Sequence, residues 1–259
     1  DVKILIDSWG SYVSHSFFQK LIDAGGEIRF FKKIKFFVDF FTKNHRRNHR
    51  KILVIDDKVS YIGSANIVEY SFDWRELVVR MEGDVALYFK RIFKQDFNLY
   101  NKYVFEKQYY TRLMRYGNMS ILRDVPSITR QKIKKHYLFL IRKAQKEILI
   151  ETPYFLPGHL LRKGLMEACR RGVDVKVIMP QHSDVRLVDI LRNRYLGILG
   201  KNGVNFLFYT PGNLHAKLLI IDKNLVSLGS PNFDYRSFRY QHEIAIVTSD
   251  ELLAASALK

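Results

Sequence analysis

An internal repeat constrains the fold of this chain more than any other feature of its sequence. Six residue types recur in the pattern H-x-K-x4-D-x6-G-S-x-N, which begins at His49 and again 166 residues later at His215. Six fixed residues, each drawn at roughly one in twenty, would match a given starting point by chance with a probability on the order of 10⁻⁸. The repeat therefore predicts two copies of one structural unit.

The sequence around both motifs predicts an α/β fold. Short runs rich in Val, Ile and Leu alternate with longer amphipathic stretches of helical period. The predicted strands are 2–6, 27–31, 51–55, 59–62, 76–81, 147–151, 173–179, 204–208, 217–221, 225–228 and 243–247. The predicted helices are 12–23, 83–99, 130–145, 158–171 and 184–200.

The repeat divides the chain into a first half, 1–108, and a second half, 130–259, joined by a linker over 109–129. The second half contains a helix–strand–helix unit over 130–171 that has no counterpart in the first half. We therefore expect the first half to be N-terminally incomplete, with roughly 40 residues preceding Asp1 in the natural protein. The second half is expected to be C-terminally incomplete, because the helix that follows its last strand has only begun at the final residue.

Composition limits the classes of protein that this chain can represent. With 259 residues, 47% hydrophobic and 27% charged, it is globular rather than disordered or fibrous. The single cysteine, Cys169, excludes an intramolecular disulfide framework and a Cys-rich zinc site. The net charge of +17 favours an anionic partner, which could be nucleic acid, an anionic membrane surface or a phosphorylated substrate.

Each repeat delivers one imidazole and one ammonium group to a common space. Side chains alternate along a strand, so His49 and Lys51 share one side, as His215 and Lys217 do. The aspartate of each motif lies five positions beyond the lysine and should face away. We therefore interpret these aspartates as structural, supporting residues rather than acids in the pocket; they are Asp56 and Asp222.

The Gly-Ser-x-Asn part of each motif suggests phosphate binding. Glycine permits close backbone approach, and short serine and asparagine side chains suit phosphate oxygens. A single copy would equally fit an ordinary turn, but two copies in register behind two His-x-Lys pairs favour the phosphate site. The predicted phosphate ligands are Ser64, Asn66, Ser230 and Asn232.

Two histidines with two lysines suit chemistry on a phosphodiester. One neutral imidazole can attack phosphorus while the other, protonated, donates to the leaving alkoxide, and the lysines stabilise charge on the phosphate. No residue pattern with metal-ligand spacing is present, so we expect neither a metal nor another cofactor. Glu76 and Glu243 open matched apolar strands and are candidates for orienting the histidines; the alternative is a surface glutamate at a strand start.

These residues resemble the phospholipase D superfamily over nearly the whole chain, and within it the bacterial cardiolipin synthases. The subfamily resemblance rests on Asn48-His49-Arg50-Lys51, Trp74-Arg75-Glu76, Thr152-Pro153-Tyr154-Phe155 and Asn232-Phe233-Asp234-Tyr235-Arg236-Ser237. It implies two pseudo-symmetric halves, each a mixed β-sheet flanked by helices, with one active site between them. It also implies that the glutamate of each half supports the histidine of the other, pairing Glu243 with His49 and Glu76 with His215.

The resemblance further implies a membrane phosphatidyltransferase. It would transfer a phosphatidyl group between two phosphatidylglycerol molecules through a phosphohistidine, with His49 as nucleophile and His215 as general acid. The enzyme would act at the surface of a bacterial cell membrane, with anchoring segments outside this chain. One alternative is a hydrolase of the same mechanism, acting on phospholipid or on nucleic acid; another is a noncatalytic phosphate-binding scaffold.

Residues 30–51 combine six phenylalanines with eight basic residues. Aromatic rings beside cations suit a lipid interface with anionic headgroups. The same mixture also fits ordinary core phenylalanines, or a site for single-stranded nucleic acid. We expect this segment to contact the membrane surface.

Overall fold

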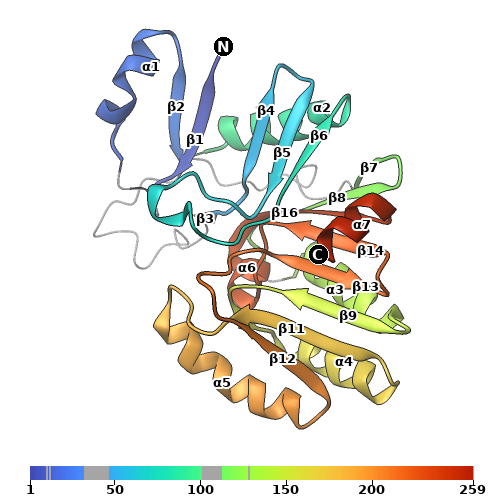
Figure 1. The fold of residues 1–259 in the computed structure, drawn as a ribbon. Coiled ribbons are helices and arrows are strands. Elements are labelled where there is room, and N and C mark those ends of the chain that lie inside the picture. Colours follow the sequence, from blue (N-terminus) through green and yellow to red (C-terminus); the bar gives the residue numbers. More distant parts are fainter. Residues whose placement is uncertain (10, 12, 32–46, 101–112, 128, 259) are drawn as a thin grey trace.

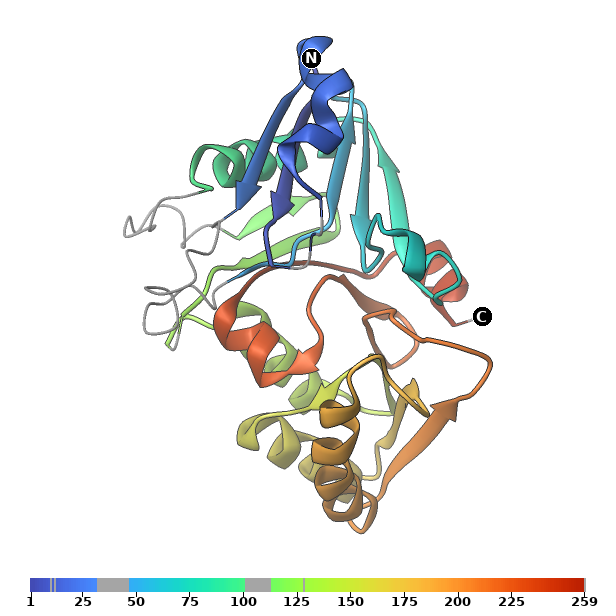
Figure 2. The same ribbon diagram turned by 90° about the vertical axis from the view of Figure 1, so that its left-hand side faces the viewer.

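The computed structural model describes residues 1–9, 11, 13–31, 47–100, 113–127 and 129–258 (Figure 1). Within them the chain forms two α/β halves, one above the other in Figures 1 and 2. The expected α/β fold is confirmed, with a mixed sheet and flanking helices.

The largest sheet is a mixed sheet of nine strands, most of them from the second half. Its order is β12-β11-β9-β13-β14-β16-β8-β7, and β3 pairs with β16 beside this path. β9 lies between β11, to which it is parallel, and β13, to which it is antiparallel. The strands are β3 (Arg47–Asn48), β7 (Met114–Tyr116), β8 (Met119–Asp124), β9 (Glu147–Glu151), β11 (Asp174–Pro180), β12 (Val204–Tyr209), β13 (Leu218–Ile221), β14 (Leu225–Gly229) and β16 (Gln241–Thr248).

The first half contains two smaller sheets. One is the parallel pair β1 (Lys3–Asp7) and β2 (Glu27–Phe31). The other is antiparallel and has the order β4-β5-β6, formed by β4 (Ile52–Ile55), β5 (Val59–Gly63) and β6 (Val78–Glu82). The register of β4 on β5 repeats that of β13 on β14, since Ile52 faces Ile62 as Leu218 faces Leu228.

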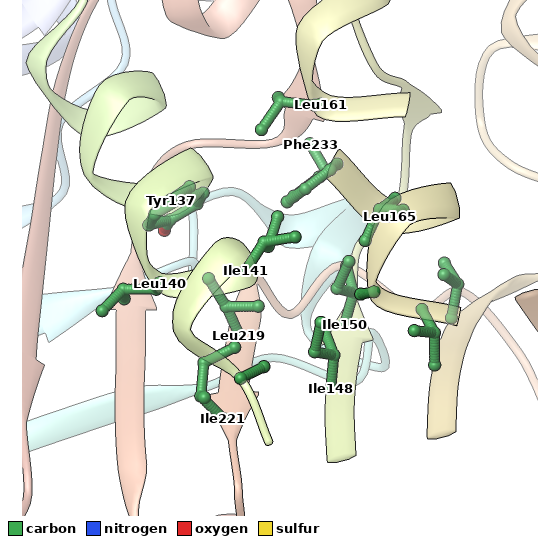
Figure 3. Close-up of a cluster of buried hydrophobic side chains, with 14 of the residues drawn as sticks. Tyr137, Leu140, Ile141, Ile148, Ile150, Leu161, Leu165, Leu219, Ile221 and Phe233 are labelled. Carbon is green, nitrogen blue, oxygen red and sulfur yellow. The ribbon is translucent and has the colours of Figure 1, made fainter. Parts of the chain in front are cut away.

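Helices cover the apolar faces of the sheets. In the second half α3 (Lys132–Lys143) and α4 (His159–Arg170) pack over one face of the large sheet, and Figure 3 shows their side chains meeting those of β9 and β13. α5 (Arg186–Gly200) packs beside β12, and α6 (Tyr235–Tyr240) precedes β16. The remaining elements are η1 (His15–Phe18), α1 (Gln19–Asp23), η3 (Glu69–Ser71), α2 (Val85–Asn98), β10 (Phe155–Leu156), β15 (Phe233–Asp234) and α7 (Glu251–Ala257).

A second apolar cluster joins the two halves. Phe89 and Ile92 of α2 and Ile62 of β5 are buried with Val226 and Leu228 of β14. Because interior packing of this kind tolerates little relative movement, the cluster fixes the position of one half on the other. The histidines, one from each half, are thereby held in a defined arrangement.

Most predicted strands and helices are observed within a few residues of their predicted ranges, but the predicted helix 12–23 consists only of η1 and α1 over residues 15–23. The elements that were not predicted are short: β3, η3, β7, β8, β10, β15, α6 and α7. Residues 114–124, inside the predicted linker 109–129, form the β7–β8 hairpin at the end of the large sheet. Its two-residue turn is Gly117-Asn118, and Gly117 has a φ of 54°. A glycine–asparagine pair is a sequence signal for such a hairpin, although the strands beside it are too short to show a clear period.

Candidate active site

Each histidine is fixed through its backbone by the opposite half. β3 pairs in parallel with the start of β16, and the His49 N–H donates to the carbonyl of His242 at 3.0 Å. In the other copy, the N–H groups of His215 and Ala216 donate to the carbonyl of Arg75 at 2.8 and 3.0 Å. In both cases the accepting residue directly precedes a predicted orienting glutamate. The two copies of the motif are thus placed by equivalent cross-half contacts.

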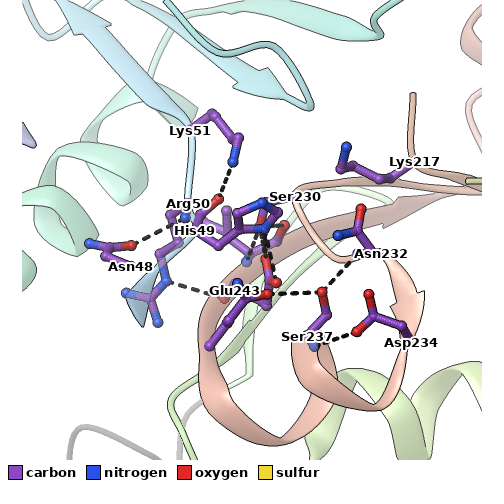
Figure 4. A network of polar contacts seen from close by, with 12 residues as sticks. Asn48, His49, Arg50, Lys51, Lys217, Ser230, Asn232, Asp234, Ser237 and Glu243 are labelled. Carbon is purple, nitrogen blue, oxygen red and sulfur yellow. Dashed lines mark hydrogen bonds and ion pairs between the residues drawn. The ribbon is translucent and has the colours of Figure 1, made fainter. Parts of the chain in front are cut away.

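The glutamates contact the histidines across the halves. His49 Nδ1 lies 3.0 Å from Glu243 Oε1 and 3.2 Å from Oε2 (Figure 4), and His215 Nδ1 lies 2.6 Å from Glu76 Oε1. The structure thus contains both pairs that the family resemblance implied. A carboxylate on Nδ1 favours the tautomer that carries its proton there, so Nε2 of each neutral ring is left with a free lone pair.

The serines of the motif differ from their predicted role as phosphate ligands. Both are fully buried. Ser64 Oγ accepts the N–H of Leu77 at 2.9 Å, and Ser230 Oγ accepts the N–H of Ile244 at 3.0 Å while donating to the Glu243 carboxylate. The Ser64 hydroxyl connects the loop after β5 to the segment that carries Glu76. The Ser230 hydroxyl connects the loop after β14 to the segment that carries Glu243. Because protein groups bond to these buried hydroxyl groups, we propose that the serines position the glutamates instead of binding phosphate.

The preceding glycines explain how the serines come so close. A Cβ on Gly63 would lie 2.1 Å from the Leu77 carbonyl oxygen, and a Cβ on Gly229 would lie 2.2 Å from that of Ile244. Both distances are far below van der Waals contact. Glycine at these positions is therefore required by close approach of two backbones, the reason expected from the sequence.

The lysines and asparagines remain available for a substrate. The ammonium groups of Lys51 and Lys217 each donate to the carbonyl of the histidine two residues earlier, which leaves further N–H groups on each. Asn232 is buried, and its Oδ1 has no hydrogen-bond partner among the described residues. Asn66 is partly buried and accepts a hydrogen bond from Ser71 through its backbone carbonyl.

Burial and like charge control the protonation of the site. Burial, then the charge of Lys51, lowers the pKa of His49. Burial and the charge of Lys217 lower the pKa of His215 to about 4. Burial lowers the pKa of Lys51 to about 8, and burial followed by the charge of Lys51 holds the pKa of Lys217 well below its ordinary value. The site therefore disfavours additional positive charge, as expected of a site that binds an anion.

The glutamates stay ionised despite their burial. Desolvation raises the pKa of Glu243, but the charge and hydrogen bond of His49 outweigh it, so the net shift is downward. For Glu76, desolvation is likewise outweighed by the hydrogen bond and charge of His215. Both carboxylates are thus charged near neutral pH and able to stabilise an imidazolium.

Each motif aspartate directly follows its strand, Asp56 after β4 and Asp222 after β13. Asp222 accepts backbone N–H groups from Gln145, Lys146 and Glu147 at 2.7–3.1 Å, in the turn that leads into β9. Asp56 occupies the same left-handed conformation, with a φ of 50° against 51° for Asp222. Asp222 is therefore a structural residue that fixes the start of β9.

Arg50 is a site residue that the sequence analysis did not select. Its guanidinium donates to both oxygens of Asp96 at 2.6 and 2.7 Å, to the Glu243 carbonyl at 3.1 Å and to the Asp124 carbonyl at 2.7 Å. Only 3% of its side chain is exposed. Arg50 connects α2, β8 and β16 directly behind the His49–Glu243 pair. The sequence offered one signal for Arg50, namely a charged residue next to an apolar strand whose side chain should point away from those of His49 and Lys51.

We predict that Arg50→Ala destabilises the fold by roughly 3–5 kcal/mol, because it leaves the mostly buried Asp96 carboxylate without its cation. Arg50→Lys is also expected to destabilise, since an ammonium group cannot reproduce the bidentate contact. Urea unfolding measures both. The exposed Arg80→Ala serves as control and should leave stability nearly unchanged. Adding Asp96→Asn to Arg50→Ala should recover part of the loss; no recovery would contradict the buried-charge explanation.

Aromatic and apolar side chains border the site. The Trp74 ring lies 5.2 Å from the His215 ring in an edge-on arrangement, and Tyr70 contacts Trp74. On the same loop Ile67, Tyr70 and Phe72 are 90%, 63% and 75% exposed. The predicted membrane segment 30–51 is described only in part: Phe30 and Phe31 are buried, while residues 32–46 lie outside the described residues.

Among the described residues, no group of three or more His, Cys, Asp or Glu side chains is arranged to hold a metal ion. In the same part of the chain, no helix has the length and apolarity needed to cross a membrane.

The fold is that of the phospholipase D superfamily. A solved structure of the phosphatidylserine synthase of Haemophilus influenzae superposes with a TM-score of 0.73 at 16% identity, covering 99% of this chain and 72% of that one. A family model described as "Cardiolipin synthase, PLD-like domain" matches residues 1–97 and 137–259. The chain therefore belongs to this family of phospholipase D-like domains.

Curated relatives in this family are named cardiolipin synthase. One from Listeria welshimeri is 33% identical over 257 residues, which cover 94% of this chain and 53% of the relative. One from Clostridium perfringens is 31% identical over 277 residues, which cover 99% of this chain and 57% of the relative. The chain thus spans a little over half the length of these relatives.

Proposed function

We propose that the chain forms the catalytic part of a cardiolipin synthase-type phosphatidyltransferase, which converts two phosphatidylglycerol molecules into cardiolipin and glycerol. The observation that carries this proposal is the pair of cross-half His–Glu contacts, each accompanied by a lysine. Two imidazoles with free Nε2 atoms can serve as nucleophile and general acid on one phosphodiester. The named relatives support phosphatidylglycerol as the substrate.

In the first step, the Nε2 lone pair of His49 attacks phosphorus and the bond from phosphorus to the glycerol oxygen breaks. His215 gives its proton to that oxygen, so glycerol leaves. In the second step, His215 takes the proton from a hydroxyl group of another phosphatidylglycerol, whose oxygen attacks phosphorus and releases His49. Each bond formed replaces one bond broken, and the proton returns to His215.

The environments of the two histidines support this assignment. The His49 side chain is 21% exposed and that of His215 is 6% exposed, so His49 is the more accessible to an incoming phosphorus atom. The lowered pKa of His49 keeps its attacking nitrogen unprotonated. An anionic phosphodiester between the halves would raise the pKa of His215, because a nearby negative charge favours the imidazolium.

The motif lysines and Asn232 would hold the phosphate, while Ser64 and Ser230 would position the glutamates. Lys51, Lys217 and Asn232 lie together at the site (Figure 4), where the ammonium groups and the side-chain amide N–H groups of Asn232 would donate to phosphate oxygens. Positively charged groups beside the non-bridging oxygens stabilise the charge that develops in phosphoryl transfer.

The exposed apolar side chains beside the site support a lipid substrate at a membrane surface. Ile67, Tyr70 and Phe72 lie on the loop that ends in Trp74, whose ring contacts His215. Apolar side chains bordering a cationic site suit a molecule with an anionic headgroup and acyl chains. We therefore place the enzyme at the surface of the bacterial cell membrane.

The test of this function is product analysis with the full-length protein. Labelled phosphatidylglycerol in liposomes is incubated with the protein and a chelator, and the lipids are separated. Cardiolipin with an equal amount of glycerol is expected. Phosphatidic acid would instead indicate a phospholipase D-type hydrolase, and absence of lipid turnover would direct the test to nucleic-acid phosphodiesters, which the charge of +17 would also attract.

The lowered pKa of Lys51 predicts how kcat/KM depends on pH in the alkaline range. If its charge binds the phosphate, kcat/KM should fall above about pH 8, where Lys51 loses its proton. Lys51→Arg keeps the charge at higher pH and should move this limb to more alkaline pH. The exposed Lys58→Arg is the matched control and should leave the profile unchanged. An unaltered limb near pH 8 in Lys51→Arg would assign it to another group.

A further inference from the structure

Helix α5 is apolar on both of its faces. On the inner face Leu199 is buried, and Leu196 packs against the cluster that contains α3 and α4. A helix that only covers a sheet normally presents polar residues to solvent. The outer face of α5 instead exposes four large aliphatic side chains, at 64%, 60%, 46% and 45%: Leu187, Ile190, Leu191 and Ile198. An apolar helix face of this kind indicates a contact beyond the second half.

The exposed aliphatic residues form a stripe that also carries positive charge. With 3.6 residues per turn, positions 187, 190, 191, 194 and 198 fall within an arc of about 100°. Arg194 lies inside this stripe, Arg186 lies at its N-terminal end and Lys201 directly follows the helix; all three are exposed. Among the described residues, none of these three cations forms an ion pair. The four aliphatic residues and these three basic residues are the α5 surface.

Polar contacts hold α5 firmly on the end of β11. Arg192, on the inner face, donates to the carbonyls of Pro180 and Gln181 at 2.8 and 2.5 Å. Asp189 accepts the backbone N–H and the hydroxyl of Ser183 at 2.9 and 2.8 Å. These contacts fix the helix and the loop before it relative to the large sheet.

The loop that leads into α5 reaches the candidate active site. Asp184 accepts the Tyr154 hydroxyl at 2.7 Å, and its charge acts on the ammonium group of Lys217. The loop over 67–74, which contains η3, borders the site from the other half, because the Trp74 ring contacts His215. Figure 1 places α5 and this η3 loop on its left-hand side, and Figure 2, viewed from that side, shows both in front. Two exposed apolar surfaces, one from each half, thus share one side of the molecule.

We propose that the α5 surface docks the protein on the anionic surface of a phospholipid bilayer. The helix would lie in the plane of the interface, with its aliphatic side chains among the headgroups and first acyl carbons and its cations on lipid phosphates. The η3 loop would enter the same interface, so that the site between the halves faces the lipid. This inference deepens the proposed function, on which it rests, by naming the surface through which the enzyme reaches its substrate.

The charge of the α5 surface favours a membrane over a second copy of the chain. In a two-fold dimer the same surface meets itself, so Arg186, Arg194 and Lys201 would face cations of the partner. Like charges opposed in an apolar interface are costly. An anionic bilayer supplies the opposite charge, and the net charge of +17 adds a long-range attraction to it.

The first test places an environment-sensitive fluorophore on the α5 surface, after Cys169→Ala has removed the cysteine of this chain. Attached at Leu191→Cys, it should shift to the blue on vesicles of phosphatidylglycerol and phosphatidylcholine, and lipids brominated in their acyl chains should quench it. Leu252→Cys is the matched control and should show neither effect, because that leucine is 84% exposed on α7, on the opposite side in Figure 1. Absence of quenching at position 191 would overturn the proposal.

The second test separates docking from catalysis. A variant that combines Leu187→Ser, Ile190→Ser and Leu191→Ser should turn over phosphatidylglycerol in vesicles at least about tenfold more slowly at limiting lipid. With dispersed dihexanoylphosphatidylglycerol it should match the wild type, as Leu252→Ser should with both lipids. Equal losses on both lipids would count against docking, since the substitutions would then act on the site itself. If the wild type turned over neither lipid, the proposed function would fail, and the fluorophore would still decide whether α5 docks.

A third test addresses the charge and the competing occupant. A variant with Arg186→Gln, Arg194→Gln and Lys201→Gln should bind vesicles that contain phosphatidylglycerol about threefold or more weakly, with no change on pure phosphatidylcholine. Unchanged binding to both would refute the anionic surface as the occupant. Sedimentation should also show the same oligomeric state for the wild type and the serine variant. A dimer that becomes a monomer in that variant, with no quenching on vesicles, would assign the α5 surface to a second copy of the chain.

Discussion

His49→Ala is expected to lower kcat by at least about 10³-fold, and His215→Ala by a similar factor. In the proposed mechanism, His49 forms and breaks a bond to phosphorus and His215 transfers the proton, so each variant removes a reacting group. Because the two act as a unit, the double variant should be no slower than the poorer single variant. The exposed His159→Ala is the matched control and should retain activity. Initial rates of cardiolipin formation measure all four.

The two single variants should differ in what they accumulate. With phosphatidylglycerol labelled on phosphorus, His215→Ala is expected to retain label on the protein after alkaline denaturation, because His49 can still attack while transfer to the acceptor is impaired. His49→Ala should retain none. Label on His49→Ala and not on His215→Ala would reverse the two roles, and near symmetry of the site makes this comparison the decisive one for the mechanism.

The strands of this fold were predictable because their periods and the repeat reinforce one another. β4 pairs with β5 in the same register as β13 pairs with β14. This follows from the motif, because each of its residues from His49 to Asn66 recurs 166 positions later. The short β7–β8 hairpin was missed because strands of three and six residues carry little periodicity.

The residues of the candidate site were predictable as a set, but their partners were not all evident. Histidine and lysine are rarely repeated in register without a shared use, and glutamates near the same offset open matched apolar strands. Ser64 and Ser230 were assigned to phosphate, whereas both are buried against the neighbouring strand by the close approach that Gly63 and Gly229 permit. Arg50 was overlooked because its partners on α2, β8 and β16 are distant in sequence, and only the tertiary fold brings them together.

Glu243→Gln is expected to lower kcat by about 10²–10⁴-fold, because an amide neither fixes the His49 tautomer as firmly nor stabilises the imidazolium. The pH dependence should change in a defined direction. Burial and the charge of Lys51 lower the pKa of His49, and the Glu243 carboxylate opposes them. Its removal should lower the pKa of His49 further, moving the acid limb of kcat/KM to lower pH.

Glu76→Gln provides the matched comparison, because its carboxylate contacts His215 instead. Titration of the two histidines by NMR should show that Glu243→Gln shifts His49 while leaving His215 nearly unchanged, and that Glu76→Gln does the reverse. Shifts confined to the histidine of the same half would contradict the cross-half pairing. Since Glu243 and His49 are 194 positions apart and belong to different halves, the expected result would make the join between the halves a requirement for catalysis.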